Sequence, residues 1–380
     1  MRGVRLPFRL LGVPLRLDAS FLLILPILGW LIASQIPAYV TLLDQVGVAV
    51  DGAALQRGAT PALLGLASAL GLFACVVLHE LGHVLVARAY GHRAEEITLW
   101  FLGGMARFRD LPRGRGAEAV VALAGPAVSL ALAFLAGSAA WVAGASWLRF
   151  LLSYLAIANG GLGLFNLLPA LPLDGGRVLR SLLELGTNRL AATRIAVGVS
   201  RAVAIALGLW GFLNVNVLMV AMAFFIHQAG SAEGRAALLE RALEGRVVRD
   251  LMTPEPATVP PGMPLAQFAR LRSFRAHTGY PVVADDGALL GFARVMDAGA
   301  EDEDGRGEPH DATVADVMRP AETVAPATPL AEVVPRLSGE GRGRLVVVDS
   351  AGRVLGVLSK TDVVRELERW SNGRAGRQRW

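Results

Sequence analysis

One short motif in the sequence combines residue types and spacing that could build a catalytic metal site. His79 and His83 are four residues apart, so on a helix both imidazoles lie on one face, about 40° from each other. Two ring nitrogens so placed can reach one zinc ion, and Glu80 beside them can take a proton from the water that the ion activates. The flanking residues are apolar, and ionisable groups inside a membrane span are costly unless they have a function.

A catalytic zinc ion usually has a third protein ligand and keeps one position for water. Asp174 is the best candidate, because it follows an apolar stretch that Pro169 and Pro172 interrupt. Such a break at membrane depth is expected only around a polar cavity. Asp174 precedes Arg177 just as the two histidines precede Arg88, so all three would lie at a similar depth. The weaker candidates are His92, Glu95, Glu96, Asp110, Glu118, Glu184 and His227.

Apolar stretches in the first 230 residues could carry these groups into a membrane, since a span needs ~20 residues. The predicted spans are residues 19–43, 60–89, 118–144 and 150–173. Residues 192–228 allow one tilted span or two short ones with a turn near 214–216. Two are favoured, because a cytoplasmic N-terminus and a cytoplasmic C-terminal part require an even number. The count is then six.

The charge distribution indicates membrane topology. Residues 1–230 carry a net charge of +7, whereas residues 231–380 carry −2. The arginines of the first part lie beside apolar stretches, which is typical of cytoplasmic loops and argues against nucleic-acid binding. Global disorder is excluded by the 53% of hydrophobic residues, and a disulfide framework is excluded because Cys75 is the only cysteine. One lysine among 37 basic residues is typical of a GC-rich prokaryotic genome.

Residues 249–369 contain an internal repeat with an offset of 64–66 residues. Residues 250–254 (DLMTP) reappear as 316–320 (DVMRP), and 281–285 (PVVAD) as 345–349 (LVVVD). Each copy predicts the order strand, helix, strand, strand, helix. The predicted segments are a linker at 231–248, a first repeat at 249–300, an acidic connector at 301–312, a second repeat at 313–369 and a tail at 370–380.

Together, the H-E-L-G-H motif and the sequence N-L-L-P-A-L-P-L-D-G-G at 166–176 resemble the site-2 protease family of intramembrane zinc metalloproteases. The repeat resembles a pair of cystathionine-β-synthase-type (CBS) domains, as found in one branch of that family. The resemblance implies a multi-domain chain. Residues 1–230 would form a polytopic α-helical membrane domain with about six transmembrane helices, and an α/β CBS-pair module would follow.

The resemblance also implies roles for single residues. Glu80 would be the catalytic base, and Asn166 would contact the substrate or the oxyanion. The family often has Asn where this chain has Ser129, so no role is assigned there. Three residues would bind one zinc ion: His79, His83 and Asp174.

Residues 97–108 are too short to span a membrane and are interrupted by Gly103 and Gly104. They predict a hairpin or a re-entrant segment beside the active site. The segment resembles the membrane-embedded β-hairpin of the family, which could pair with an unwound strand of the substrate.

The second repeat contains the better candidate nucleotide site. Ser359, Thr361 and Asp362 follow a short strand at the start of a helix, which would place hydroxyl and backbone N–H groups near a phosphate and a carboxylate near a ribose. The first repeat keeps Asp297 but has Arg294 in place of Ser359. ATP or another adenine nucleotide is the ligand that the CBS resemblance implies. The alternative is that Ser359 only caps the last helix.

The sequence therefore predicts a metalloendopeptidase that hydrolyses peptide bonds within or near transmembrane segments of membrane proteins, regulated by adenine nucleotide at the CBS pair. It would be a multi-pass protein of a prokaryotic cell membrane, with the N-terminus and the CBS module in the cytoplasm. The expected partners are a transmembrane protein substrate, the lipid bilayer and a second copy bound through the CBS pair, but no nucleic acid. A CBS-regulated transporter or channel, which would not need Glu80, and an inactive membrane-binding homologue are the alternatives.

Overall fold

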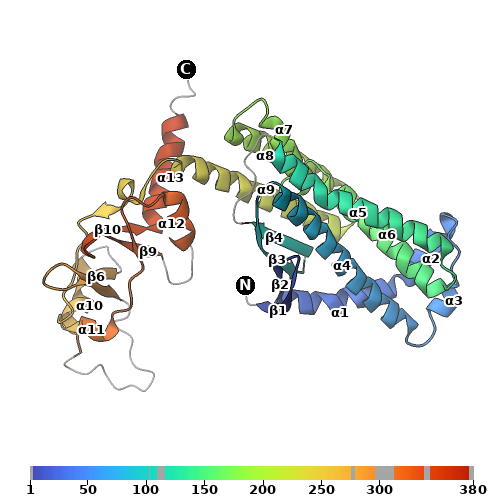
Figure 1. Cartoon of the computed structure of the whole chain (residues 1–380), viewed down its shortest axis with the longest axis horizontal. Coiled ribbons are helices and arrows are strands. Elements are labelled where there is room, and N and C mark those ends of the chain that lie inside the picture. Colours follow the sequence, from blue (N-terminus) through green and yellow to red (C-terminus); the bar gives the residue numbers. More distant parts are fainter. Residues whose placement is uncertain are drawn as a thin grey trace. The chain divides into compact units, whose positions relative to one another are not determined.

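The computed structural model describes residues 3–101, 103–108, 116–274, 279–295, 312–337 and 343–375. By its internal contacts the chain divides into two compact units, residues 1–235 and 236–380. Figure 1 shows that the first unit is mainly helical and that the second combines strands with helices.

The first unit begins with a β-hairpin that the sequence analysis did not predict. β1 (Gly3–Leu10) pairs with β2 (Val13–Asp18), which runs parallel to β3 (Ala94–Trp100), and β3 pairs with β4 (Gly103–Phe108). The sheet order is β1-β2-β3-β4, so β4 is an edge strand. Of residues 97–108, where a hairpin or re-entrant segment was expected, 97–100 and 103–108 thus lie in the antiparallel pair β3–β4.

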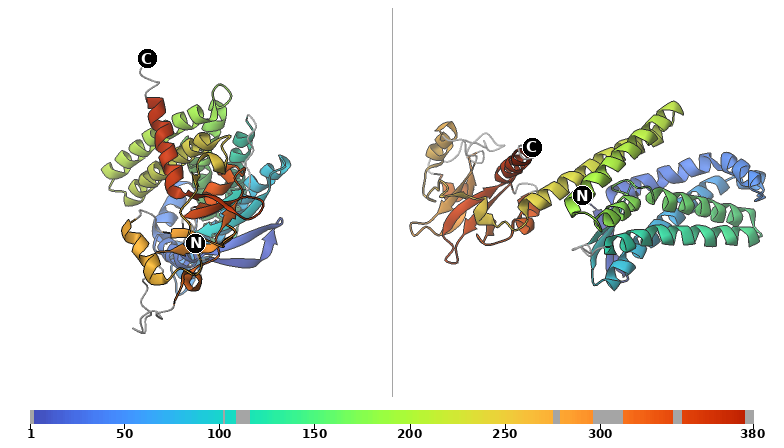
Figure 2. Two further views of the ribbon diagram at one scale, coloured as in Figure 1. Left: turned by 90° about the vertical axis from the view of Figure 1, so that its left-hand side faces the viewer. Right: turned by 90° about the horizontal axis from the view of Figure 1, so that it is seen from above.

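Among the described residues, four helices are long and apolar enough to cross a membrane: α4 (Thr60–Ala89), α5 (Ala117–Val142), α6 (Ser146–Asn166) and α8 (Arg189–Leu213). Figure 2 shows the helices of the first unit lying side by side from two further directions. Residues 19–43, expected as one span, lie in two helices bent by 56°, α1 (Ala19–Ser34) and α2 (Ile36–Gln45). A proline within the first turn of α2 explains the restart, since its ring suits a helix start but not a helix interior. Counted as one broken span, this pair makes a fifth.

Residues 192–228 contain a break, as expected. α8 ends at Leu213, and α9 (Val217–Leu243) begins after a turn. α9 continues beyond the expected end at 228 and through most of the predicted linker. It is not among the helices that are long and apolar enough to span, so the sixth span remains a prediction.

The fourth expected span, 150–173, ends earlier than the sequence suggested. α6 stops at Asn166, a loop follows, and α7 (Asp174–Leu183) begins at Asp174 itself. Pro169 and Pro172 in the loop cannot donate the backbone hydrogen bonds that would continue the helix. Asp174 therefore opens a new helix instead of ending a long one.

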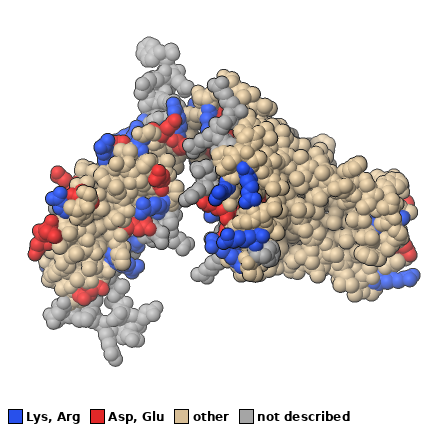
Figure 3. Space-filling model, in the orientation of Figure 1, with Lys and Arg blue, Asp and Glu red and all other residues tan. Residues whose placement is uncertain are grey.

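The surface of the first unit is largely uncharged. On the face drawn in Figure 3, its charged side chains gather at two ends, one beside β1 and β2 and one beside α2 and the short α3 (Gly52–Leu55). Between these ends large apolar side chains are exposed, including Leu23, Phe134, Ile205 and Phe212. Such a continuous apolar surface is far larger than water-soluble monomers expose and suits a lipid environment.

The second unit contains two small sheets. β6 (Gly279–Val283) pairs with β7 (Leu289–Arg294), and the other sheet has the order β5-β10-β9-β8. Its strands are β5 (Thr253–Pro254), β8 (Thr323–Val324), β9 (Arg344–Val348) and β10 (Val354–Ser359). Its helices are η1 (Val248–Asp250), α10 (Leu265–Phe274), α11 (Val314–Val317), α12 (Leu330–Leu337) and α13 (Lys360–Ala375).

The two repeats exchange their first segments. β5 comes from the first repeat but pairs with β10 of the second, and Phe292 on β7 exchanges backbone hydrogen bonds with Arg319 of the second repeat. The second repeat has the expected order strand, helix, strand, strand, helix in β8, α12, β9, β10 and α13. The last expected helix of the first repeat lies outside the described residues.

Candidate metal centre

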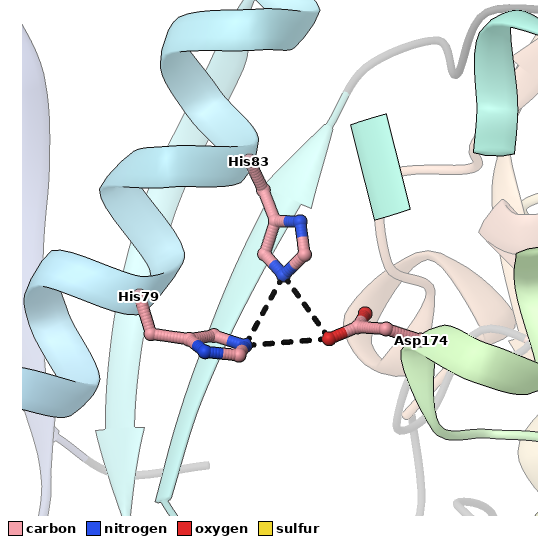
Figure 4. A group of neighbouring side chains, drawn as sticks. All are labelled: His79, His83 and Asp174. Carbon is pink, nitrogen blue, oxygen red and sulfur yellow. Dashed lines mark hydrogen bonds and ion pairs between the residues drawn. The ribbon is translucent and has the colours of Figure 1, made fainter. Parts of the chain in front are cut away.

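Three of the predicted ligands meet at one point inside the first unit. His79 and His83 project from α4, and Asp174 approaches them from the start of α7 (Figure 4). The two Nε2 atoms are 3.3 Å apart, and Asp174 Oδ2 lies 3.3 Å from His79 Nε2 and 3.4 Å from His83 Nε2. All three residues are buried. No other group of three His, Cys, Asp or Glu residues in the described part of the chain lies this close.

The spacing of these three atoms fits a tetrahedral zinc site. With metal–ligand bonds of about 2.0–2.1 Å, the edge of the tetrahedron is about 3.3–3.4 Å, which the three separations match. Asp174 Oδ2 is buried and has no hydrogen-bond donor among the residues that the structure describes. A buried carboxylate oxygen without a donor is costly unless a cation lies beside it. The donor set and its geometry therefore suit zinc.

Helix α5 fixes the orientation of both imidazoles. His83 Nδ1 lies 2.8 Å from the carbonyl oxygen of Val121. A carbonyl only accepts, so this nitrogen must donate, and in a neutral ring the lone pair then lies on Nε2, which faces the site. His79 Nδ1 lies 2.9 Å from the hydroxyl of Ser129, which favours the same tautomer. Hydrogen bonds of this kind orient metal ligands.

Ser129 is thus a functional candidate to which the sequence analysis assigned no role. Its position gave a signal, because it follows Gly125 by four residues and so lies on the same face of the helix. At Gly125 a Cβ atom would lie 2.2 Å from His83 Nε2 and 2.6 Å from His79 Nε2. Only glycine lets the backbone of α5 approach the two rings so closely.

The loop before α7 folds back over the start of that helix. At Gly175 a Cβ atom would lie 2.2 Å from the carbonyl oxygen of Leu167, and at Gly176 one would lie 2.3 Å from the nitrogen of Leu171. Ser200 on α8 secures the loop, since its hydroxyl accepts a 2.7 Å hydrogen bond from the nitrogen of Leu171. Both glycines therefore serve a close backbone approach, as the sequence suggested.

Glu80 lines a cavity of about 470 Å³ together with the three predicted ligands. Its Oε2 accepts a 3.0 Å hydrogen bond from the backbone nitrogen of Ala106 on β4. At Gly104 on the same strand a Cβ atom would lie 2.8 Å from Glu80 Cγ. The edge strand β4 thus lies directly against the predicted catalytic base.

Further residues complete the wall of the cavity. Asn166, the last residue of α6, lines it, and its Nδ2 donates a 3.0 Å hydrogen bond to the carbonyl oxygen of Leu162. Arg177 lines it one turn after Asp174, and its buried Nε has no hydrogen-bond partner in the described part of the chain. Arg177 was not among the residues predicted for the site. α9 also contributes to the wall, with Met222, Phe225 and Ala229.

Three of the weaker ligand candidates form ion pairs, and one of them, Glu118, also lines the cavity. Glu96 forms ion pairs with Arg5 and Arg16, and Glu118 and Glu184 form ion pairs with arginines of α7 and α8. His227 is exposed. Asp110 lies outside the described residues.

In the second unit, Ser359 and Asp362 form a helix cap at the start of α13. Asp362 Oδ2 accepts hydrogen bonds from the nitrogen of Ser359 at 2.9 Å and from its hydroxyl at 2.6 Å. Thr361 beside them is exposed. Asp297, the counterpart of Asp362 in the first repeat, lies outside the described residues.

Arg344, the first residue of β9, pairs with Ser359 of the cap in the register of β9 and β10. Arg294 ends β7. Burial, followed by the charge of Arg294, lowers the pKa of the Arg344 guanidinium from its ordinary value, and the charge of Asp362 opposes this shift. Arg344 therefore lies beside the cap, opposite Ser359 in the register of β9 and β10, and feels the charge of an arginine from the first repeat.

Comparison with known proteins gives matches along most of the chain. Residues 67–144 and 138–209 match peptidase family M50, and residues 248–298 and 314–369 match the CBS domain. A zinc metalloprotease of Methanocaldococcus jannaschii is 29% identical over 361 residues, which cover 95% of each chain. Rip3 of Mycobacterium tuberculosis is 30% identical over 379 residues, 95% of this chain and 92% of Rip3. A solved site-2 protease from Methanocaldococcus jannaschii is 29% identical, with a TM-score of 0.43, and covers 62% of this chain and 96% of that one.

Replacing Gly125 by alanine should prevent metal binding, because the added methyl group would occupy the space beside both Nε2 atoms. The helix itself should not suffer, since alanine favours a helix over glycine by about 1 kcal/mol. The wild type should contain about one zinc ion per purified chain, as a single site requires. The variant should contain almost none. Gly161→Ala, at a position with nothing within 4 Å, should keep its zinc. Full zinc content in Gly125→Ala would contradict the site geometry.

Replacing Ser129 by alanine should weaken zinc binding by roughly 10–100-fold, as loss of a partner of a metal-ligating histidine usually does. The affinity can be measured by competition with a chromophoric chelator. Ser68→Ala is the matched control, because Ser68 is equally buried on α4 but its hydroxyl has no hydrogen-bond partner. Equal affinities in the two variants would show that Ser129 does not support His79.

Proposed function

We propose that this chain, which belongs to peptidase family M50 and is a zinc metalloprotease of the site-2 protease type with CBS domains, hydrolyses peptide bonds within or near transmembrane segments of other membrane proteins. The observation that carries the proposal is the cavity in which His79, His83, Asp174 and Glu80 meet among apolar helices. Membership of this family favours a protease over a transporter or channel.

A zinc ion held by His79, His83 and Asp174 would supply a Lewis acid that polarises the scissile carbonyl and acidifies water. Glu80 receives the proton of the attacking water and passes it to the leaving amide nitrogen. The hydrogen bond from the nitrogen of Ala106 keeps the carboxylate of Glu80 directed along the cavity wall. Asn166 retains a second amide N–H beyond the one bound to Leu162, and this group donates to the substrate or to the oxyanion.

We propose that the substrate binds along the exposed edge of strand β4. A transmembrane helix hides its peptide bonds in its own hydrogen bonds, so it must unwind before cleavage. The extended segment then adds to the exposed edge of β4, where the nitrogen of Ala106 already points away from β3 to Glu80. This arrangement would place the scissile bond beside the catalytic base. The β3–β4 hairpin would lie within the membrane.

We also propose the membrane topology. α1 with α2, α4, α5, α6, α8 and the apolar first part of α9 would make six spans, with the N-terminus and the CBS module in the cytoplasm. The number of spans is even only if residues 192–228 contain two of them, one on each side of the turn between α8 and α9. The basic residues beside β1 and β2 suit a cytoplasmic face.

The CBS pair is our proposed regulatory site for ATP or another adenine nucleotide. Arg344 and Arg294 would bind the phosphates, Ser359 and Thr361 would donate to them, and Asp362 would accept from the ribose hydroxyls. Support comes from the register of β9 and β10, which pairs Arg344 with Ser359 and so places a basic residue beside the helix cap. Asp297 would form a second, less complete site. Pairing of two CBS modules would make the protein a homodimer.

Replacing Glu80 by glutamine should abolish cleavage but leave zinc bound, because the carboxylate is the base and not a ligand. The loss should reach about 10²–10⁴-fold, the usual contribution of a general base. Membrane proteomes of cells producing each form should show fragments that end inside transmembrane segments only with the wild type. A His79→Ala variant should lose both zinc and cleavage. Cleavage by Glu80→Gln at the normal rate would exclude this mechanism.

ATP should stabilise the CBS module of the full-length chain. At 100 times its dissociation constant a ligand adds about 2.7 kcal/mol to the free energy of unfolding, which corresponds to about 5–10 °C in Tm for a unit of this size. Arg344→Gln should remove that shift without lowering the Tm of the nucleotide-free protein, because it removes a charge that burial disfavours. Arg353→Gln, at an exposed arginine, should keep the shift. If ATP changes neither the Tm nor the rate of cleavage, Ser359 and Asp362 only cap the helix.

A further inference from the structure

A buried group of charges holds the helix that presents Asp174. Arg180 lies six residues after Asp174 on α7, and its side chain is 4% exposed. Its Nη1 donates a 2.7 Å hydrogen bond to Glu233 Oε1 on α9, and its Nη2 donates to Glu118 Oε1 at the start of α5. One guanidinium therefore joins three helices with two charge-assisted hydrogen bonds, which are among the stronger polar contacts in proteins.

A second contact joins the same two helices α5 and α7. The nitrogen of Ala119 on α5 donates a 3.3 Å hydrogen bond to the hydroxyl of Ser181, the residue after Arg180. Glu118 also accepts a hydrogen bond from Arg189 at 3.3 Å. The position of α7 along α5 is thus fixed by adjacent residues on both helices.

The same helix α5 orients the other two predicted ligands. Val121 and Ser129 hold the imidazoles of His83 and His79. All three predicted ligands therefore depend on α5, the histidines directly and Asp174 through Arg180. A displacement of α7 by 1 Å would exceed the ~0.2 Å within which zinc–ligand distances normally vary.

We propose that Arg180 is a positioning residue for Asp174, and that Glu118 and Glu233 hold Arg180 in this role. The inference rests on the proposed metal site. Because Glu233 belongs to α9, the position of α9 affects the position of Arg180 and, through it, that of Asp174. α9 also lines the cavity with Met222 and Phe225, so a movement of this helix would affect the cavity wall and the metal site together.

The informative variant is Glu233→Gln. The carboxylate of Glu233 is partly exposed, at 25%, and glutamine has nearly the same shape, so the fold should persist. Arg180→Gln is less suitable alone, because it would leave Glu118 buried without its main partner. In the full-length protein in detergent, Glu233→Gln should raise the zinc dissociation constant by about 10-fold, as the loss of outer support for a ligand does. Glu244→Gln, at an exposed carboxylate just beyond the end of α9, should leave it unchanged.

A double-mutant comparison separates positioning from general stability. If Arg180 acts through Asp174, Glu233→Gln should have no further effect on zinc affinity in an Asp174→Asn background. Equal weakening in both backgrounds would overturn the proposal, and so would unchanged affinity in the wild-type background. A wild-type protein that binds no zinc would remove the metal site and this inference with it. A wild-type protein that binds zinc but cleaves no membrane protein would overturn the proposed function and leave the inference intact.

Discussion

The close contact between α4 and α5 is the constraint on which the rest of the site depends. Glycines on both helices permit it, since a Cβ atom at Gly82 would lie 2.9 Å from the carbonyl oxygen of Ala124, and one at Gly125 would meet both histidine rings. Small residues are the usual means by which helices in membranes approach each other, because lipid offers no hydrophobic force between them. At this distance α5 can hydrogen-bond Nδ1 of each imidazole. The packing of the two helices therefore also sets the orientation of the two ligands.

Polar groups in an apolar bundle must find partners inside the protein, and this requirement arranges the remaining contacts. The backbone nitrogen of Leu171 donates a hydrogen bond to Ser200, and Glu80 accepts one from the backbone nitrogen of Ala106. The buried charge of Arg180 is balanced by two carboxylates. Among the described residues, Asp174 Oδ2 has no donor, and the buried Nε of Arg177 in the same cavity has no acceptor. A buried carboxylate oxygen without a donor is a position that a cation would stabilise.

The local sequence pattern indicated the residues of the candidate site better than it indicated the residues that support them. The four-residue spacing of His79 and His83 and the prolines before Asp174 are local signals, and the family drawn from them is confirmed by the relatives. Ser129 and Arg180 contact groups 50 and 62 residues away in sequence, so the spacing from Gly125 was the only local signal for Ser129 and nothing local indicated Arg180. The β1–β2 hairpin was missed for another reason. Its arginines were interpreted as topology signals, although their alternation with apolar residues is also typical of a strand.

In the second unit, the capping and binding interpretations of Asp362 do not exclude each other. One carboxylate oxygen, Oδ2, caps α13 through Ser359. The other, Oδ1, lies 3.8 Å from Nη1 of Arg365, most of whose side chain is exposed, and solvent screens so weak a pairing. A carboxylate offers about four acceptor positions, so the cap can hold the side chain in one orientation while Oδ1 accepts from a ribose. In the proposed nucleotide site, the helix cap would therefore orient Asp362 for binding and would not compete with it.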